Sequence, residues 1–306
     1  MSRRRELQQH LQQLHEIRGI LNAMKNLALM ETHKLARFLD AQQQAVKAIE
    51  NIAGDFQHFF PFISTSPEVR QPTLDVIVLF GSERGFCGDF NQRLLQQLAP
   101  ITNTDAPPTR TDAHNNPATP RLIALGRKLC DRLEHDTRVA ARLSGPSVVE
   151  EVPTVLNALI DAIGALQARH GQLNLRLVYH NQQSSGQPLN RQLLPPFQHT
   201  EPPATYATQA PMLNLPPATF FSELVDHYLF AVLHETIYSS LMAENHRRVE
   251  HMGGAVSHLE QTLTTLARRS RSLRQEEITE EIEVILLSAE GLDESLRRLK
   301  RSTPGT

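Results

Sequence analysis

Seam residues recur about every 3.5 positions through residues 7–56, which is the repeat of a coiled coil. The same rhythm returns in residues 249–266, near the other end of the chain. Long helices gain most of their stability by packing an apolar stripe against a partner, so we predict that the two stretches pair. We assign the first seam to Leu7, Leu11, Leu14, Ile17, Leu21, Met24, Ala28, Glu31, Leu35, Phe38, Gln42, Ala45, Ile49, Ile52 and Phe56, and the second to Val249, Met252, Val256, Leu259, Leu263 and Leu266.

The region between these stretches alternates short apolar runs with amphipathic segments. This alternation is typical of a mostly parallel sheet with helices packed on it. The predicted fold class is therefore α/β plus a long coiled coil, in which an antiparallel two-helix coiled coil carries an inserted Rossmann-like α/β domain. We expect strands at residues 74–80, 121–125, 173–179 and 189–194, and helices at residues 90–98, 127–133 and 153–169.

Proline and polar residues mark the expected domain boundaries. We predict an N-terminal coiled-coil helix in residues 1–60, a central α/β domain in residues 73–200 and a C-terminal coiled-coil helix in residues 212–306. Residues 102–120 are expected to form a loop and residues 202–217 a linker. The second helix should run from Phe220 towards Arg301, about 40 Å longer than the first, so part of it should extend past its partner.

Composition argues against several classes of protein. A net charge of −2 gives no bulk attraction to nucleic acid, and two cysteines in 306 residues do not form a disulfide framework. The apolar run at residues 76–80 is far shorter than the roughly 20 residues that span a bilayer. No apolar segment of a secretory signal follows the first arginines. We therefore expect no nucleic-acid partner, a reducing compartment and no direct insertion into a membrane.

The turn at residues 81–88 lies between an expected strand and an expected helix, where phosphate-binding loops occur. It lacks the Gly-Lys-Ser/Thr ending of a P-loop, and its glycines do not have the Gly-x-Gly-x-x-Gly spacing. We therefore interpret it as a structural turn that needs glycine for unusual backbone angles. Its key residues are predicted to be Gly85, Cys87, Gly88 and Asn91.

Two residue patterns resemble catalytic or metal sites but are incomplete. Cys87 at a helix start could be a nucleophile, yet no histidine lies near it in the sequence, so a packed thiol is the simpler interpretation. His234 and Glu235 begin a zinc-protease motif, but Tyr238 stands where the second histidine is needed. The sequence thus predicts no catalytic residue, no metal and no cofactor.

Several segments resemble the gamma subunit family of F-type ATP synthase. Residues 3–5 with 20–28 resemble the family's basic start and its TKAMEMVA stretch, and residues 83–91 resemble DRGLCGGLN. Residues 243–252 are similar to SEQAARMVAM, and Gln275 with residues 278–282 is similar to RQASITQEL. The match covers nearly the whole chain in order, so the chain is identified as a member of this family, with differences that suggest a divergent bacterial form.

The resemblance implies a non-catalytic rotor shaft inside a hexamer of α and β subunits. Its base would rest on the membrane c-ring with the epsilon subunit beside it, on the cytoplasmic face of the bacterial plasma membrane. Ion flow would turn ring and shaft and drive ATP synthesis, or hydrolysis in reverse. The coupling ion, proton or sodium, stays open.

The resemblance also implies roles for five residues by their match to the family motifs. Met24, Arg248, Gln275, Thr279 and Glu281 would contact the catalytic β subunits or hold the shaft helices together. A guanidinium can pair with a partner carboxylate through two hydrogen bonds, which suits Arg248 to such a contact. The alternative, that each residue forms a pair within its own chain, stays open.

Two other functions remain open from the sequence. A small α/β enzyme could use the helices to form oligomers, and its isolated chain would then bind nucleotide or turn over substrate. A non-rotating coiled-coil scaffold would bind partners without transmitting torque.

Overall fold

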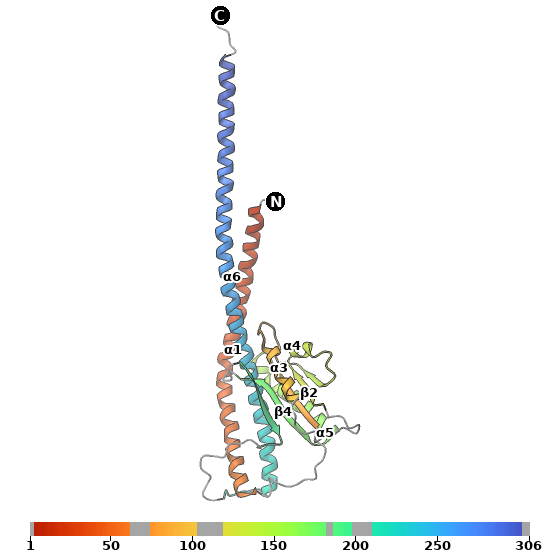
Figure 1. The fold of residues 1–306 in the computed structure, drawn as a ribbon. Helices are drawn as coiled ribbons and strands as arrows, with labels where there is room; N and C mark the ends of the chain where they lie inside the picture. Colours follow the sequence, from red (N-terminus) through yellow and green to blue (C-terminus); the bar gives the residue numbers. More distant parts are fainter. Residues whose placement is uncertain (1–2, 62–73, 103–118, 182–185, 198–209, 302–306) are drawn as a thin grey trace. The chain divides into compact units, whose positions relative to one another are not determined.

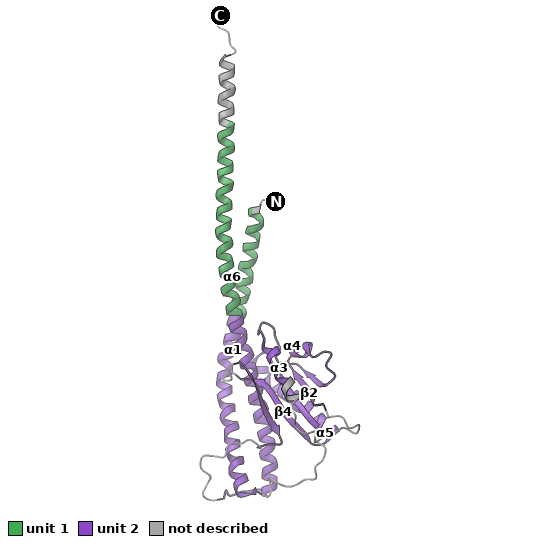
Figure 2. Cartoon of the chain, in the orientation of Figure 1, with its two compact units in different colours: residues 1–24, 252–306 green, residues 25–251 purple. Residues whose placement is uncertain are grey.

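The computed structural model describes residues 3–61, 74–102, 119–181, 186–197 and 210–301. The chain forms two compact units (Figure 2). Unit 1 consists of residues 1–24 and 252–306, and unit 2 of residues 25–251. Two long helices contribute to both units: α1 (Arg3–Phe59, 57 residues) and α6 (Pro217–Arg301, 85 residues) (Figure 1).

The two long helices confirm the prediction from the seam pattern. Helix α6 begins three residues earlier than expected, at Pro217, because proline suits the first position of a helix, where its missing N–H is not needed. The Phe220 N–H then donates to the Pro216 carbonyl at 3.0 Å and closes the first turn. The predicted loop at residues 102–120 falls mostly outside the described residues, as does the first half of the linker at residues 202–217.

Unit 2 contains a five-stranded sheet in the order β3-β2-β1-β4-β5. Strand β1 pairs in parallel with β2 and β4, β2 pairs in parallel with β3, and β5 runs antiparallel to β4 at one edge. This confirms the mostly parallel α/β sheet. The strands are β1 (Leu74–Phe80), β2 (Arg121–Leu125), β3 (Val139–Leu143), β4 (Leu173–His180) and β5 (Pro188–Leu194).

Strand β3 is the element that the sequence reasoning missed. It is a short edge strand with the sequence VAARL, and none of its residues is fully buried. Two alanines and an arginine weaken the local strand signal, because alanine and charged residues pack poorly on a pleated surface. Pairing with β2 supplies what the local sequence lacks.

Helices cover both faces of the sheet (Figure 1). Alternate β1 side chains point to opposite faces. Val76, Val78 and Phe80 pack in a core with α1, α5 and α6 of unit 2. Ile77 and Leu79 pack in a second core with α3 and α4. The covering elements are α3 (Phe90–Thr102), α4 (Arg127–Arg132) and α5 (Val152–His170), which a single 3₁₀ turn (Val149–Glu151) precedes.

The long helices run antiparallel within each unit. In unit 2 the ring of Phe56 lies 5.3 Å from Phe220, and the ring of Phe38 lies 5.8 Å from Tyr238, so α1 rises as α6 descends. In unit 1 the Arg4 guanidinium pairs with Glu277 at 3.0 Å.

The predicted seam is out of register by one residue in the middle of α1. Phe38 and Ile52 are each 47% exposed, whereas their neighbours Leu39 and Ala53 are buried. Val46 is likewise buried in place of Ala45. A repeat of 3.5 residues alternates spacings of three and four, and the order of these two spacings sets the phase of the seam. In this part of α1, apolar residues occur at the positions of both phases. Leu39, Val46 and the fully buried Ala53 define the observed phase, whereas Phe38 stays half-exposed although its ring contacts Tyr238 of α6.

The last residue of β4, His180, is a buried neutral base. Its Nε2 lies 2.9 Å from the Phe90 carbonyl oxygen, which can only accept, so Nε2 carries the hydrogen. Burial lowers the pKa of His180 to about 4, and the cations Arg247 and Arg93 act in the same direction.

This lowered pKa predicts a loss of stability on acidification. The unfolded chain takes up the proton near pH 6.5 and the folded chain only near pH 4, so His180 should remove up to about 3 kcal/mol of unfolding free energy as the pH falls through that window. A His180→Gln variant keeps a donor for the Phe90 carbonyl but cannot titrate. Urea unfolding of both chains from pH 7 to pH 4 measures the difference. Parallel pH profiles for the two chains would contradict this assignment.

Candidate functional site

The point where the sheet order reverses is the natural place to look for a site. The chain leaves β1 towards β2 and returns from β3 to β4 on the other side of β1. Ligands of parallel α/β domains bind beyond the carboxyl ends of the strands at such a reversal. Here β1 ends at Phe80, and the turn at residues 81–88 follows it directly.

Helix α6 fills this position. All its residues from 235 to 245 are buried, although such a long helix normally keeps one face in solvent. The Ser240 hydroxyl lies 3.3 Å from the carbonyl oxygen of Phe80, the last residue of β1. Small side chains at Ser239, Ser240 and Ala243 let the helix approach closely.

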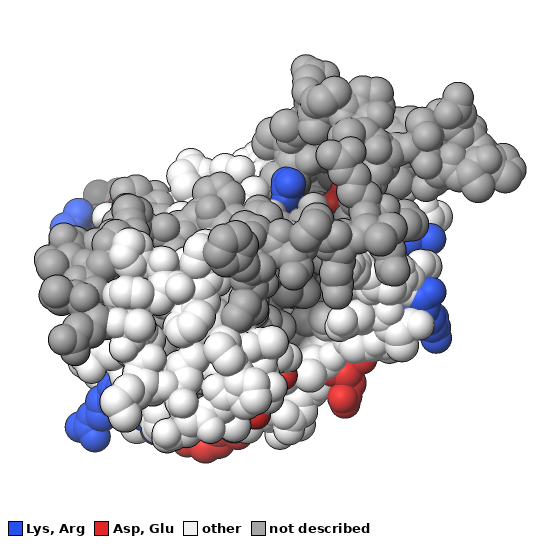
Figure 3. All heavy atoms as spheres, turned by 90° about the horizontal axis from the view of Figure 1, so that it is seen from below, with Lys and Arg blue, Asp and Glu red and all other residues white. Residues whose placement is uncertain are grey.

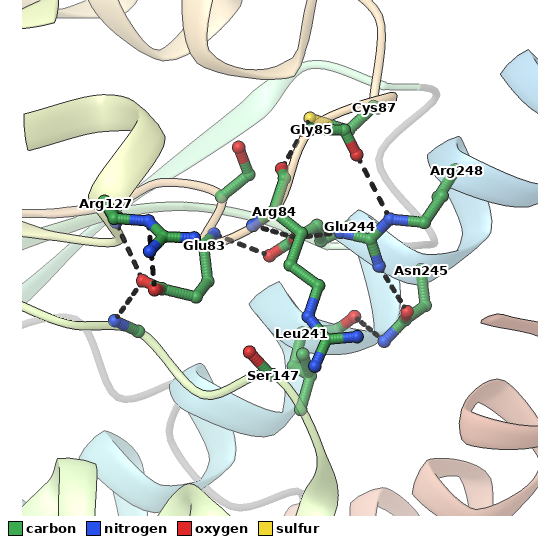
Figure 4. A network of polar contacts seen from close by, with 12 residues as sticks. Glu83, Arg84, Gly85, Cys87, Arg127, Ser147, Leu241, Glu244, Asn245 and Arg248 are labelled. Atoms are coloured by element: carbon green, nitrogen blue, oxygen red, sulfur yellow. Dashed lines mark hydrogen bonds and ion pairs between the residues drawn. The ribbon is translucent and has the colours of Figure 1, made fainter. Parts of the chain in front are cut away.

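The carboxylate of Glu244 holds the turn to α6 (Figure 4). It accepts hydrogen bonds from the backbone N–H of Glu83 at 3.3 Å and of Arg84 at 3.2 Å. The side chain is 5% exposed, and this burial raises the pKa of Glu244 above its ordinary value, although Arg248 and the two N–H groups oppose the shift. Two backbone N–H groups that converge on an anion are the arrangement by which loops of this kind bind phosphate.

Arg248 completes the contact from one helical turn further along α6. Its guanidinium pairs with Glu244, donates to the Asn245 side-chain oxygen at 2.6 Å and donates to the Gly85 carbonyl at 3.2 Å. Arg248 is 6% exposed. Of the two interpretations from the sequence, the described geometry is that of a pair within the chain, and it joins α6 to the turn.

Glu83 extends the network to two further loops (Figure 4). Its carboxylate accepts from the backbone N–H of Arg127 and of Gly145, each at 2.8 Å. Arg127 begins α4 directly after β2, and Gly145 lies just after β3. We name the set Glu83, Glu244, Asn245 and Arg248 the clasp, because it ties α6 to the loops that follow β1, β2 and β3.

The predicted turn residues have different roles. Gly88 has a φ of +62°, so its glycine is required by the backbone, but Gly85 has no such angle and open space around it. The expectation of unusual angles therefore holds for Gly88 and is wrong for Gly85. Gly81 was not among the predicted key residues, but no larger residue fits there, because a Cβ at this position would lie 2.3 Å from the Leu129 Cβ.

Asn91 and Cys87 stabilise the turn from inside. The Asn91 amide oxygen accepts from the Ser82 N–H at 2.9 Å, and its nitrogen donates to the Ser82 hydroxyl at 2.8 Å. Cys87 is 5% exposed in the second core, and burial raises the pKa of its thiol, which disfavours the thiolate. This environment fits the packed thiol.

The other predicted residues lie in unit 1. Met24 is half-buried on α1, whereas Gln275, Thr279 and Glu281 are exposed on α6. The Thr279 hydroxyl donates to the Gln275 carbonyl at 2.8 Å. Each of these residues lies in a different unit from Arg248, which belongs to unit 2.

Among the described residues, no three His, Cys, Asp or Glu side chains could hold a metal ion together. Helices in this part of the chain are too polar or too short to cross a bilayer.

His234 lies between the rings of Phe230 and Tyr238, and Glu235 pairs with Arg191. On the face seen in Figure 3, uncharged side chains make up most of the described surface.

Loss of the Glu244 carboxylate should destabilise unit 2 strongly. Glu244→Ala leaves the Arg248 charge buried without its partner and two backbone N–H groups unsatisfied, which should lower the unfolding free energy by about 3–5 kcal/mol. The matched control is Glu250→Ala, because among the described residues this helix carboxylate pairs with Arg247 and His246 at the surface, and such pairs contribute about 0–1 kcal/mol. Chemical denaturation of the purified chains measures both values. Equal losses in the two variants would show that the clasp contributes no more than a surface pair.

Comparison with known proteins assigns the chain to a family. A family model described as ATP synthase matches residues 3–292. The ATP synthase gamma chain of Lachnoclostridium phytofermentans is 21% identical over 96% of this chain and 100% of its own length. The gamma chain of a Parafrankia species is 23% identical over 94% of this chain and 97% of its own.

Solved structures share the fold. A chain of the Euglena gracilis mitochondrial ATP synthase covers 99% of this chain, and 97% of its own length is matched, with a TM-score of 0.62 at 11% identity. A chain from the central stalk and c-ring of the Tetrahymena thermophila mitochondrial enzyme covers 77% of this chain and 99% of its own, with a TM-score of 0.55 at 15% identity. Because the family model spans nearly the whole sequence and the curated relatives match it end to end, the chain belongs to the ATP synthase family as a gamma chain, the subunit of the central rotor stalk.

Proposed function

We propose that this chain turns inside a hexamer of α and β subunits and couples ion flow through a membrane c-ring to ATP synthesis or hydrolysis, without catalysis of its own. Family membership supports the coupling role. The position of α6 in the crevice beyond β1 is the observation that supports the proposed absence of catalysis.

The filled crevice explains why a Rossmann-like domain need not bind a nucleotide. In such domains the anionic group of the ligand accepts hydrogen bonds from backbone N–H groups that follow the first strand. Here the Glu244 carboxylate accepts hydrogen bonds from the backbone N–H groups of Glu83 and Arg84. A phosphate would have to displace a buried carboxylate that is itself paired with Arg248. The α/β domain is therefore proposed to be an attachment for the shaft.

The proposed domains follow the sequence boundaries. Residues 1–60 and 212–306 would form the shaft, and residues 73–200 would form the body that meets the c-ring and the epsilon subunit. The protein would then lie on the cytoplasmic face of a bacterial plasma membrane, attached through these partners.

The exposed part of α6 suits contacts with the α and β subunits. Gln275, Thr279 and Glu281 are exposed in unit 1 and free to meet a partner surface. Large apolar side chains are exposed around them, which is unusual on a helix that stays in water. These residues are Ile278, Ile282, Val284, Ile285, Leu286 and Leu287, each between 46% and 68% exposed. We propose that residues 275–287 face the catalytic subunits, whereas Arg248 acts inside its own chain.

The function is tested by assembly and rotation. The tagged chain should co-purify with α, β and epsilon subunits from its source, and a bead attached to it should rotate when the immobilised complex hydrolyses ATP. The purified chain alone should neither bind ATP at micromolar concentration nor hydrolyse it, because Glu244 occupies the crevice. Co-purification without rotation would favour a scaffold, and turnover by the isolated chain would favour an enzyme; either outcome rejects the proposal.

Met24 offers a more local test. Met24→Lys places a charge at a half-buried position of α1, so it should impair coupling more than assembly. The control is Met30→Lys on the same helix, where the side chain is already 59% exposed. ATP hydrolysis, ion-driven ATP synthesis and subunit content are measured in the same vesicles. Normal synthesis in the Met24 variant would remove this residue from the coupling surface.

A further inference from the structure

Arg191 on the edge strand β5 joins three elements of unit 2. One nitrogen of its guanidinium, Nη1, donates to Glu235 of α6 at 2.9 Å. The other, Nη2, donates to Glu50 of α1 at 2.7 Å. The sheet edge is thereby fixed to both long helices through a single planar group.

The surroundings of Arg191 make these pairs stronger than surface pairs. The side chains of Arg191 and Glu235 are 24% and 11% exposed. The Tyr228 ring lies 6.0 Å from the guanidinium carbon, and the Tyr228 hydroxyl lies 3.5 Å from Glu50. Burial alone would lower the pKa of Arg191, but Tyr228, Glu235, Tyr179 and Glu50 raise it overall, so the guanidinium stays charged. Burial raises the pKa of Glu235, and Arg191 opposes this shift.

This contact lies apart from the clasp along α6. Glu235 and Glu244 are separated by nine residues, which corresponds to about 14 Å of rise and about 2.5 turns. The two carboxylates therefore point to roughly opposite sides of the helix. The α/β domain thus holds α6 at two heights and from two sides, through β5 at one end and through the turn at residues 81–88 at the other.

Two separated attachments have a mechanical consequence. A domain held at one place can pivot around the helix, and apolar contacts resist such sliding weakly because they are not directional. Hydrogen-bonded ion pairs have a defined geometry, so a shift of either helix breaks them. A second attachment on the opposite side of the helix removes the pivot.

We propose that Arg191 is a positioning residue for torque transfer, which locks the α/β domain to α1 and α6 so that the domain and shaft turn together. This inference rests on the proposed function. Arg191 acts through Glu50 and Glu235, the two carboxylates with which it pairs. The clasp and the Arg191 contact would then form the two ends of one rigid attachment.

The test uses the assembled ATP synthase in sealed vesicles, with ATP hydrolysis and ATP-driven ion uptake measured on the same sample. The readout is ion uptake per ATP hydrolysed, because a merely structural defect lowers the amount of complex and both rates together. Arg191→Met keeps the unbranched apolar stem of the side chain and removes its charge. The matched control is Arg176→Met on the neighbouring strand β4, since Arg176 donates within the sheet to Gln192 and no hydrogen bond or ion pair joins it to α1 or α6 among the described residues.

We expect uptake per ATP to fall by about threefold or more in Arg191→Met, within the range by which single residues change coupling between sites. Arg176→Met should keep the wild-type ratio. Arg191→Lys should recover part of it, because an ammonium can pair with one carboxylate but cannot span two with fixed geometry. If Arg191→Met does not assemble, Glu50→Gln and Glu235→Gln weaken one side at a time, and each should lower the ratio.

The outcomes separate the two proposals. A wild-type complex that hydrolyses ATP without ion uptake rejects the proposed function, and the inference falls with it. If the wild-type complex couples normally, the proposed function stands. An unchanged ion uptake per ATP in Arg191→Met, or in both glutamine variants, then rejects only the role of Arg191. Hydrogen exchange on the isolated chain gives a second readout, since Arg191→Met should speed exchange of β5 amides more than Arg176→Met, which loses the bond to Gln192 within the sheet.

Discussion

The structure of unit 2 depends on one buried carboxylate. Glu244 enters the crevice beyond β1 and takes the backbone N–H groups of Glu83 and Arg84, the positions at which related α/β folds hold an anionic ligand. Because a carboxylate buried without partners would be very unfavourable, its burial requires Arg248 and the turn to be in place together. Glu244 and Asn245 can be buried in this stretch of α6 because their polar groups and those of Arg248 and the turn satisfy one another.

This interaction determines what the α/β domain can bind. The sheet has a hydrophobic core on each face, but the site beyond β1 where such domains usually bind a ligand is filled by α6 of the same chain. The α/β domain becomes an attachment for that helix. A gamma chain of ATP synthase has to pass motion between partners, and a domain that grips a helix at two places suits this task better than one that binds a nucleotide.

The sequence predicted the parts of the fold that depend on local pattern. Leu74–Phe80 is apolar except for Asp75 and was found at its predicted bounds, and α1 was found within two residues of the predicted range 1–60. Strand β3 was missed because its pairing with β2, and not its residues, makes it a strand. The α1 seam was misplaced by one residue because apolar residues stand in both phases of the repeat, and the choice between Phe38 and Leu39 is made by packing within the fold. The turn at residues 81–88 was recognised, but its partner Glu244 was not, since only the fold brings them together. The one local signal was the spacing of Glu244 and Arg248, one helical turn apart.

Hydrogen exchange at the backbone N–H groups of Glu83 and Arg84 tests the central claim most directly. Both lie in a turn between β1 and α3, where amides normally exchange quickly with water. If the Glu244 carboxylate holds them, they should exchange as slowly as the central amides of β1. Exchange at the rate of an open surface turn would mean that the crevice is not closed by Glu244, and the account of the α/β domain as an attachment would be wrong.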